Sequence, residues 1–197
     1  MRKSVVRQRA PARDLTPVRA VFLVGFMGAG KSSVGRALGQ RLGWDFEDLD
    51  DRIERRETRT VAEIFRVSGE REFRRAERTA LRQVLEELGG GAKRVVALGG
   101  GAFVQKENAR QLEAAGVPTV FLDAPVEELW RRCQEQANEL GTERPLLRTQ
   151  AGFRRLHEKR RLGYLKALLK VDTSNRSVQA IATEIAGILD LKPGFLI

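Results

Sequence analysis

The sequence predicts a three-layer α/β fold in which a parallel sheet of five strands lies between two layers of helices. The chain has 197 residues, a length that suits one domain with a sizeable core. From Arg19 onward, short apolar runs alternate with amphipathic segments, a pattern typical of strand–helix units. The apolar runs are continuous rather than alternating, so we expect strands that are buried on both faces of a parallel sheet.

The predicted elements follow one another as strands and helices in turn. The strands are expected at 20–25, 44–50, 94–100, 119–124 and 169–174. The helices are expected at 32–42, around Ile53, and at 69–88, 106–116, 126–136 and 177–189. The strand at 44–50 has the weakest signal because its tail is acidic.

Two segments fall outside this pattern. Residues 1–17 are basic, contain Pro11 and Pro17 and have no apolar core long enough for a secretory signal, so we expect a flexible tail. Residues 135–150 are polar and contain Gly141 and Pro145, which predicts a mobile lid. We therefore expect a single domain over residues 18–197 that carries this lid.

Composition narrows the class of protein. The net charge of +10 suits nucleic acid, membrane surfaces or anionic small molecules as partners. The basic residues are spread beside acidic ones and only 6% of residues are aromatic, which disfavours an extended nucleic-acid surface. One cysteine, Cys133, excludes an intramolecular disulfide, and one histidine, His157, disfavours a zinc site. We expect a cytoplasmic protein without a transmembrane helix.

Residues 25–32 match the phosphate-loop pattern G-x-x-x-x-G-K-[ST] between a predicted strand and a predicted helix. Glycines let the backbone approach phosphate oxygens, and the N–H groups at a helix N-terminus attract an anion. Lys31 would reach the terminal phosphates of ATP, and the Ser32 hydroxyl would ligate Mg²⁺. The predicted ATP contacts in this loop are Gly28, Ala29, Gly30, Lys31, Ser32 and Ser33.

A phosphoryl acceptor needs a carboxylate near its hydroxyl. Asp48 and Asp50 fall at the C-terminal end of the second predicted strand, where open parallel sheets bind ligands. Strand alternation predicts that both carboxylates point the same way. N-capping of the helix around Ile53 is the competing interpretation of this pair.

Arg74 and three glycines extend the predicted acceptor site. Phe73 is expected to face the core, so Arg74 lies at its rim, where a bidentate guanidinium could grip a substrate carboxylate. Gly99, Gly100 and Gly101 end a buried strand, and their entropic cost indicates that something lies close to the backbone. A tight turn is the competing interpretation of these glycines.

The motifs together resemble those of the shikimate kinases. The phosphate loop, the D-x-D pair, GEREFRRAE, LGGGA, ERPLL and EKRRLGY occur in that family's order, from Val21 to Leu189. The resemblance implies a P-loop kinase of the nucleoside-monophosphate-kinase type with strand order 2-3-1-4-5. It also implies ATP and shikimate as substrates, Mg²⁺ as cofactor, shikimate 3-phosphate as product, and neither nucleic acid nor membrane as partner. No apolar stripe stands out, so we expect a monomer.

The resemblance also implies roles at the acceptor end. Asp50 would bind the reacting shikimate hydroxyl and accept its proton, and Asp48 would be an acid that holds Mg²⁺ through water. Arg74 and Arg160 would clamp the shikimate carboxylate, with the three glycines lining the same pocket.

Two further arginines match family positions at the nucleotide end. Arg144 would close over the transferring phosphate from the lid, and Arg132 would contact adenine. The stretch between Trp130 and Arg144 is a few residues longer than usual in the family. A gluconate kinase of the same fold, and a nucleotide-binding module without catalysis, are the alternative functions.

Overall fold

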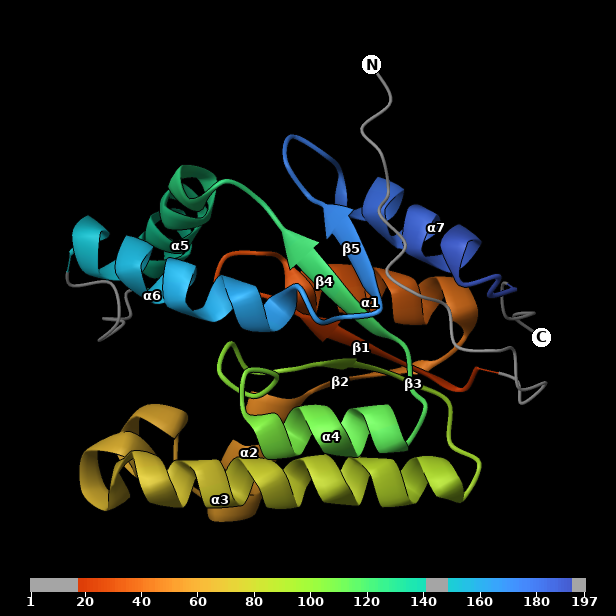
Figure 1. The fold of residues 1–197 in the computed structure, drawn as a ribbon, viewed down its shortest axis with the longest axis horizontal. Coiled ribbons are helices and arrows are strands. Elements are labelled where there is room, and N and C mark those ends of the chain that lie inside the picture. The colour runs from red at the N-terminus through yellow and green to blue at the C-terminus, as the bar shows by residue number, and fades with distance from the viewer. Residues whose placement is uncertain (1–17, 141–148, 193–197) are drawn as a thin grey trace.

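The computed structural model describes residues 18–140 and 149–192 of the chain (Figure 1). Its elements are β1 (Ala20–Val24), α1 (Lys31–Leu42), β2 (Asp45–Asp48), α2 (Leu49–Glu57), α3 (Val61–Gly89), β3 (Arg94–Ala97), α4 (Lys106–Ala114), β4 (Thr119–Asp123), α5 (Val126–Leu140), α6 (Gln150–Tyr164), β5 (Leu169–Asp172) and α7 (Val178–Ile188). The predicted tail 1–17, most of the predicted lid and Arg144 lie outside the described residues.

The five strands form one parallel sheet in the order β2-β3-β1-β4-β5. The central strand β1 pairs through Phe22 with Val96 of β3 and with Thr119 of β4. Helices α3 and α4 pack together on one side of the sheet, and α1 and α7 pack together on the other (Figure 1). The predicted three-layer fold and its strand order are confirmed.

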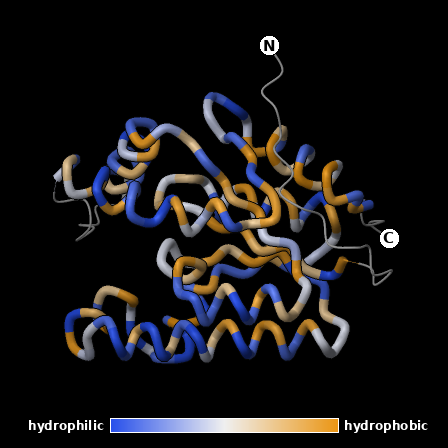
Figure 2. Tube along the Cα trace, in the orientation of Figure 1, coloured by the Kyte–Doolittle hydropathy of each residue, from blue (hydrophilic) through white to orange (hydrophobic). Residues whose placement is uncertain are grey.

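The central strands are buried along their whole length. All residues of β1 and β4 are buried, as their apolar sequences predicted. The edge strand β2 has only exposed and partly buried residues, and this explains its weaker sequence signal. Figure 2 shows the most hydrophobic stretches running through the sheet and along one side of the helices.

Helix α3 is bent at Gly69, where φ is 77° and ψ is 173°. Few residues other than glycine adopt this conformation. The helix predicted over 69–88 begins at this bend, whereas the helical segment 61–68 before it was not predicted. That segment starts at a capping box, in which Thr60 Oγ1 accepts from the Glu63 N–H and the Glu63 carboxylate accepts from the Thr60 N–H.

Helix α5 is longer than the sequence predicted, because it continues to Leu140. The expectation that a lid begins at Glu135 is therefore wrong for residues 135–140. These residues are mostly good helix formers, and Gly141 is the first helix breaker after them. Polar composition indicated a loop here, but helix propensity decided the local structure.

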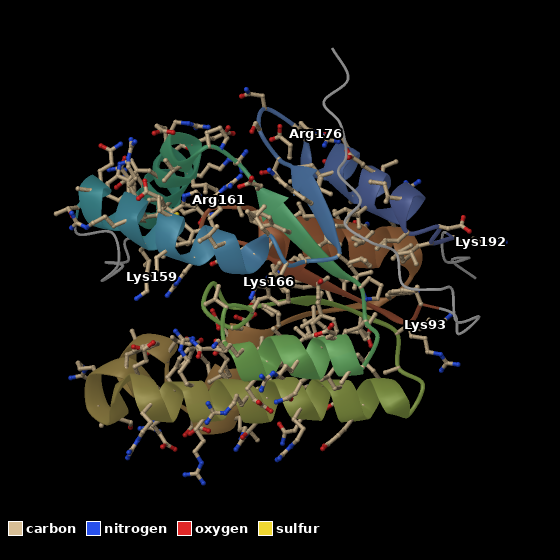
Figure 3. The ribbon with its side chains drawn as sticks, in the orientation of Figure 1. Lys93, Lys159, Arg161, Lys166, Arg176 and Lys192 are labelled. Carbon is tan, nitrogen blue, oxygen red and sulfur yellow. The ribbon has the colours of Figure 1, made fainter. Side chains whose placement is uncertain are left out.

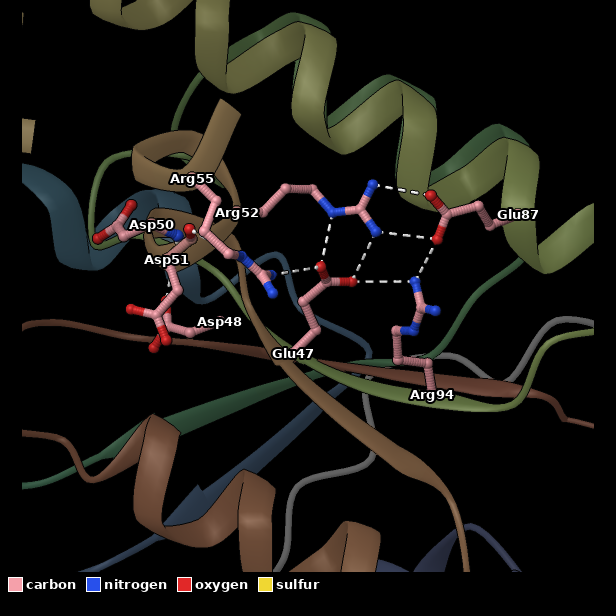
Figure 4. Close-up of polar contacts among 8 residues, drawn as sticks. All are labelled: Glu47, Asp48, Asp50, Asp51, Arg52, Arg55, Glu87 and Arg94. Atoms are coloured by element: carbon pink, nitrogen blue, oxygen red, sulfur yellow. Dashed lines mark hydrogen bonds and ion pairs between the residues drawn. The ribbon is translucent and has the colours of Figure 1, made fainter. Parts of the chain in front are cut away.

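An ion-pair network ties the edge of the sheet to the helices beside it (Figure 4). Arg52 of α2 donates to both carboxylate oxygens of Glu47 in β2, at 2.6 and 3.0 Å, and to both of Glu87 in α3, at 2.8 and 2.9 Å. Arg94 of β3 donates to Glu47 at 2.9 Å. The hydrogen bonds from Arg52 lower the pKa of Glu87 to about 2. The network steadies β2 and α2 immediately beside Asp48.

Charged side chains project from both helical layers (Figure 3). Several of the basic ones are paired with acids: Arg161 and Lys170 both contact Asp123, at 3.0 and 2.8 Å, and Arg176 contacts Glu184. Within residues 18–140 and 149–192, no helix combines the length and hydrophobicity needed to cross a membrane.

Candidate active site

The phosphate loop joins β1 to α1. Gly28 and Gly30 have φ values of 78° and 84°, and a Cβ at Gly28 would lie 2.6 Å from the carbonyl oxygen of Leu129. Both the backbone conformation and the packing against α5 therefore require glycine at residue 28. Gly30 caps α1 without a side-chain hydrogen bond, which leaves the first N–H groups of the helix for an anion.

Lys31 folds back over the phosphate loop. Its Nζ donates to the carbonyl oxygens of Gly25 and Phe26, both at 3.1 Å, so the ammonium group is held over the loop. Ala29 differs from its neighbours, because its side chain is buried and its N–H donates to the Phe26 carbonyl at 3.3 Å. Of the predicted loop contacts, Ala29 is the one that points into the protein.

Asp48 connects the phosphate loop to α2. Its Oδ2 accepts from Ser32 Oγ at 2.7 Å, and its Oδ1 accepts from the Asp50 N–H at 3.1 Å. Asp48 is thus the N-cap of α2, and the capping interpretation is confirmed for this residue. The expectation that Asp48 and Asp50 alternate along one strand is wrong, because the cap starts the helix at Leu49 and leaves Asp50 in its first turn.

Asp50 presents a buried carboxylate atom to the site. Its Oδ1 is buried and has no hydrogen-bond partner among the described residues. Burial, helped by the nearby charge of Asp48 and opposed by Lys31, raises the pKa of Asp50 to about 7. The carboxyl group can therefore gain or lose a proton near neutral pH.

The three glycines after β3 allow side chains of the site to approach the backbone. A Cβ at Gly99 would lie 2.5 Å from Asp50 Oδ1, and a Cβ at Gly101 would lie 2.5 Å from Arg74 Nη2. Real Cβ atoms do not approach other atoms this closely, so a larger residue at either position would displace a carboxylate or a guanidinium. The sequence indicated that some group lies close to the backbone of these glycines, and the structure shows that the carboxylate of Asp50 and the guanidinium of Arg74 do so.

Arg74 lies at the rim of the core as predicted, beside Phe73, which is 4% exposed. Its Nη1 is 3.0 Å from both carboxylate oxygens of Glu77, and its Nη2 is 3.1 Å from Glu70. Glu77 is buried, and burial raises its pKa although Arg74 acts in the opposite direction. Glu77 was not among the predicted site residues; its spacing of three residues from Arg74 was the available signal.

The two remaining predicted arginines in the described ranges behave differently. Arg160 of α6 reaches the site, with its guanidinium carbon 5.9 Å from the ring centre of Phe26. Arg132 of α5 instead donates to the Thr173 carbonyl at 2.9 Å and to the Gly28 carbonyl at 3.4 Å. Arg132 therefore braces the phosphate loop against the loop that follows β5.

These groups line one cavity of about 650 Å³. The predicted site residues that line it are Gly28, Gly30, Lys31, Ser32, Ser33, Asp48, Asp50, Arg74, Gly99, Gly100, Gly101 and Arg160. Ala29 and Arg132 are not among its lining residues. Figure 1 shows α5 and α6 on one side of the region and the first turns of α3 on the other. Helices α5 and α3 contribute lining residues that the sequence did not predict: Gln136 from α5, and Val61 and Phe65 from α3.

The donor set suits Mg²⁺. Ser32 Oγ and Asp48 Oδ2 are hard oxygen ligands 2.7 Å apart, and Mg²⁺ is commonly held by one or two such groups together with waters and phosphate oxygens. In the described part of the chain, no three His, Cys, Asp or Glu side chains converge to bind a metal by themselves. The residues therefore fit an ion that arrives with a nucleotide.

Comparisons with known proteins identify relatives of this chain. The family model for shikimate kinase matches residues 27–190. The shikimate kinase of Geobacter metallireducens is 43% identical over 176 residues, which are 88% of this chain and 93% of that protein. The structure of shikimate kinase from Acinetobacter baumannii in complex with shikimate has a TM-score of 0.74 and 35% identity, over 88% of this chain and 94% of that chain.

A structure of a gluconokinase from Sinorhizobium meliloti 1021 is similar in fold alone, with a TM-score of 0.52 and 18% identity, over 87% of this chain and 91% of that chain. The shikimate kinases thus share about twice as much sequence with this chain. The fold, the phosphate loop and these matches together show that the chain belongs to the shikimate kinase family.

Proposed function

We propose that this protein transfers the γ-phosphoryl group of ATP to a hydroxyl of shikimate and forms shikimate 3-phosphate. One observation carries the proposal: the buried Oδ1 of Asp50, which no described residue satisfies, lies in the same cavity as the phosphate loop and two arginines. Such a cavity would hold ATP at the phosphate loop and, beside it, an acceptor that meets a proton-accepting carboxylate and an anion site.

At the phosphate end, the N-terminus of α1 and Lys31 would bind the β- and γ-phosphates. Ser32 would hold Mg²⁺ directly and Asp48 would hold it through water, and the ion would neutralise phosphate charge. Positioning and charge stabilisation supply most of the catalysis of phosphoryl transfer. Arg144 would add a further positive charge over the transferring group.

At the acceptor end, Asp50 would orient the substrate hydroxyl and take its proton. A carboxylate with a pKa of about 7 is a stronger base than an ordinary aspartate and is still largely ionised slightly above neutral pH. Gly99 leaves room for this carboxylate beside the backbone. The substrate hydroxyl would supply the hydrogen bond that Asp50 Oδ1 lacks within the described protein.

The substrate carboxylate would bind to Arg74 and Arg160. The Glu77 partner of Arg74 is 1% exposed, whereas its Glu70 partner is 67% exposed. We expect the substrate to replace the exposed Glu70 and the buried Glu77 to keep the guanidinium in place, because an unpaired buried carboxylate is costly. Arg132 would support the adenine end through its contact with the phosphate loop.

The proposal is tested by coupled measurement of ADP release with ATP and Mg²⁺, and with shikimate, gluconate or no acceptor. We expect release that depends on shikimate. Release that depends on gluconate would overturn the acceptor and keep the reaction class. ATP binding without release on either acceptor would favour a nucleotide-binding module.

We further propose that the protein acts as a monomer in the cytoplasm. Only Phe65, Val67 and Leu162 are exposed large hydrophobic residues in the described ranges, which gives little apolar surface for a stable partner. The chain has a single cysteine, Cys133, and therefore no intramolecular disulfide, as is common in a reducing compartment.

A further inference from the structure

Tyr164 is a buried polar side chain that the proposed reaction does not use. It is the last residue of α6 and is 0% exposed, and its ring lies 5.3 Å from that of Phe121 in β4. Its hydroxyl donates to the carbonyl oxygen of Gly100, which lies 64 residues earlier in the chain. The hydroxyl therefore connects α6 to the glycine turn after β3.

The bond from Tyr164 fixes the peptide between Gly100 and Gly101. A trans peptide is planar, so the Gly100 carbonyl and the Gly101 N–H point in opposite directions. Gly100 and Gly101 line the cavity, whereas Tyr164 is not among its described lining residues. Because Tyr164 holds the Gly100 carbonyl, the Gly101 N–H points away from Tyr164.

The peptide between Gly99 and Gly100 is also held by a hydrogen bond to its carbonyl oxygen, in this case from a backbone N–H. The Ala102 N–H donates to the Gly99 carbonyl at 3.0 Å, so the N–H of Gly100 points away from that bond. Arg74 Nη2 lies close enough to Gly101 to exclude a Cβ there. The Arg74 guanidinium thus lies beside the glycine turn at the cavity, and guanidinium and peptide N–H donors are groups that suit an anion.

The same hydroxyl lies beside Arg160, one helical turn earlier in α6. A Cβ at Gly100 would lie 3.5 Å from Arg160 Nη1 and 3.8 Å from the Tyr164 hydroxyl oxygen. Burial raises the pKa of Tyr164 to about 12, although Arg160 opposes the change. The hydroxyl therefore stays protonated at neutral pH, donates to the carbonyl and turns its lone pairs toward the guanidinium.

We propose that Tyr164 is a positioning residue that aims the Gly101 N–H and the Arg160 guanidinium at the carboxylate of the substrate. The inference rests on the proposed function, because it assumes an acceptor whose carboxylate lies between Arg74 and Arg160. Donors that are oriented before the anion arrives bind it without the free-energy cost of ordering them.

Tyr164→Phe keeps the ring and removes the hydroxyl. We expect the KM for shikimate to rise about ten-fold, the loss typical of a weakened hydrogen bond to a charged group. The KM for ATP should stay within about two-fold, because the phosphate loop is untouched. A binding comparison with shikimate methyl ester sharpens the test: the variant's affinity for the acid relative to the ester should fall about ten-fold, and it should bind the ester as wild type does.

Phe121→Leu is the matched control, because it loosens the packing of the same ring without removing the hydroxyl. It should lower the melting temperature and leave the shikimate-to-ester affinity ratio at the wild-type value. Equal losses for acid and ester in Tyr164→Phe, or no loss for either, would overturn the positioning role. Absence of shikimate-dependent turnover in the wild-type protein would instead overturn the proposed function.

The wild-type protein provides a second measurement if Tyr164→Phe does not fold. Tyr164 is the only tyrosine of the chain, so tyrosine labelled with ¹³C at the ring carbon that bears the hydroxyl gives one signal. Saturating shikimate should shift this signal, because its carboxylate adds a negative charge beside the Arg160 guanidinium, and the methyl ester should shift it much less. The same signal position with and without shikimate would contradict the inference.

Discussion

Replacing Asp50 with asparagine should stabilise the fold above neutral pH and abolish phosphoryl transfer. An aspartate in the unfolded chain ionises near its ordinary pKa of 3.8, whereas burial raises the pKa of folded Asp50 to about 7. Between these values the folded state holds a proton that the unfolded state has lost, so the stability of the wild-type protein falls as the pH rises. Asparagine has nearly the same shape and does not ionise.

The size of the effect follows from the pKa change. A rise in pKa from 3.8 to about 7 corresponds to about 4 kcal/mol of stability if the whole shift contributes. Asp50 is half-buried as a residue, so solvent screening reduces this value. We therefore expect Asp50→Asn to gain about 2 to 4 kcal/mol over wild type between pH 4 and pH 8.

Urea denaturation of both proteins at pH 4 and pH 8 measures how the difference in their free energies of unfolding changes with pH. Titrations of groups far from Asp50 occur in both proteins and cancel. Asp51→Asn is the matched control: Asp51 is exposed, so removing its charge should change the pH dependence much less. A difference between wild type and Asp50→Asn that does not vary with pH, or a variant less stable than wild type at pH 8, would refute the reasoning.

Four further predictions follow from the site. Lys31→Ala should abolish turnover and keep the circular dichroism of wild type; turnover near the wild-type rate would contradict the role of Lys31 at the phosphates. Arg74→Lys keeps the charge and loses the guanidinium fork, so isothermal titration should show a larger loss of affinity for shikimate than for ATP, and equal losses would argue against a carboxylate contact. Gly99→Ala would press a Cβ against Asp50 and should lower the stability by about 1 to 3 kcal/mol and raise the KM for shikimate; a wild-type melting curve would show that the turn relaxes freely. The pH profile of kcat/KM for shikimate should fall below pH about 7 as Asp50 is protonated, and a flat profile from pH 5 to 8 would exclude Asp50 as the base.

Local sequence patterns predicted the parts of the fold that depend on residues close together in the chain. The buried strands β1 and β4 were readable because a strand covered on both faces needs continuous apolar sequence. The phosphate loop was readable because its left-handed backbone at Gly28 and Gly30 requires glycine whatever surrounds it. The strand order was predicted only through the family resemblance, since pairing between distant segments leaves no local signal.

Two errors show where local patterns compete. The segment around Asp48 suits either a strand or a helix cap, and the hydrogen bond from the Asp50 N–H to Asp48 decided in favour of the cap one residue before Asp50. Residues 135–140 suit either a polar loop or a solvated helix, and their helix propensity decided in favour of the helix. In both segments, the residue types alone fit either local structure.

The sequence by itself determined the α/β class, the phosphate loop and the family, because each depends on residue types at fixed spacings. Only the tertiary structure decided that Asp50 has a pKa of about 7, that Glu77 is buried behind Arg74, and that Tyr164 holds the Gly100 carbonyl. These properties arise from distances and burial between segments far apart in the chain. Such distances exist only after the strands are ordered and the helices have closed over them.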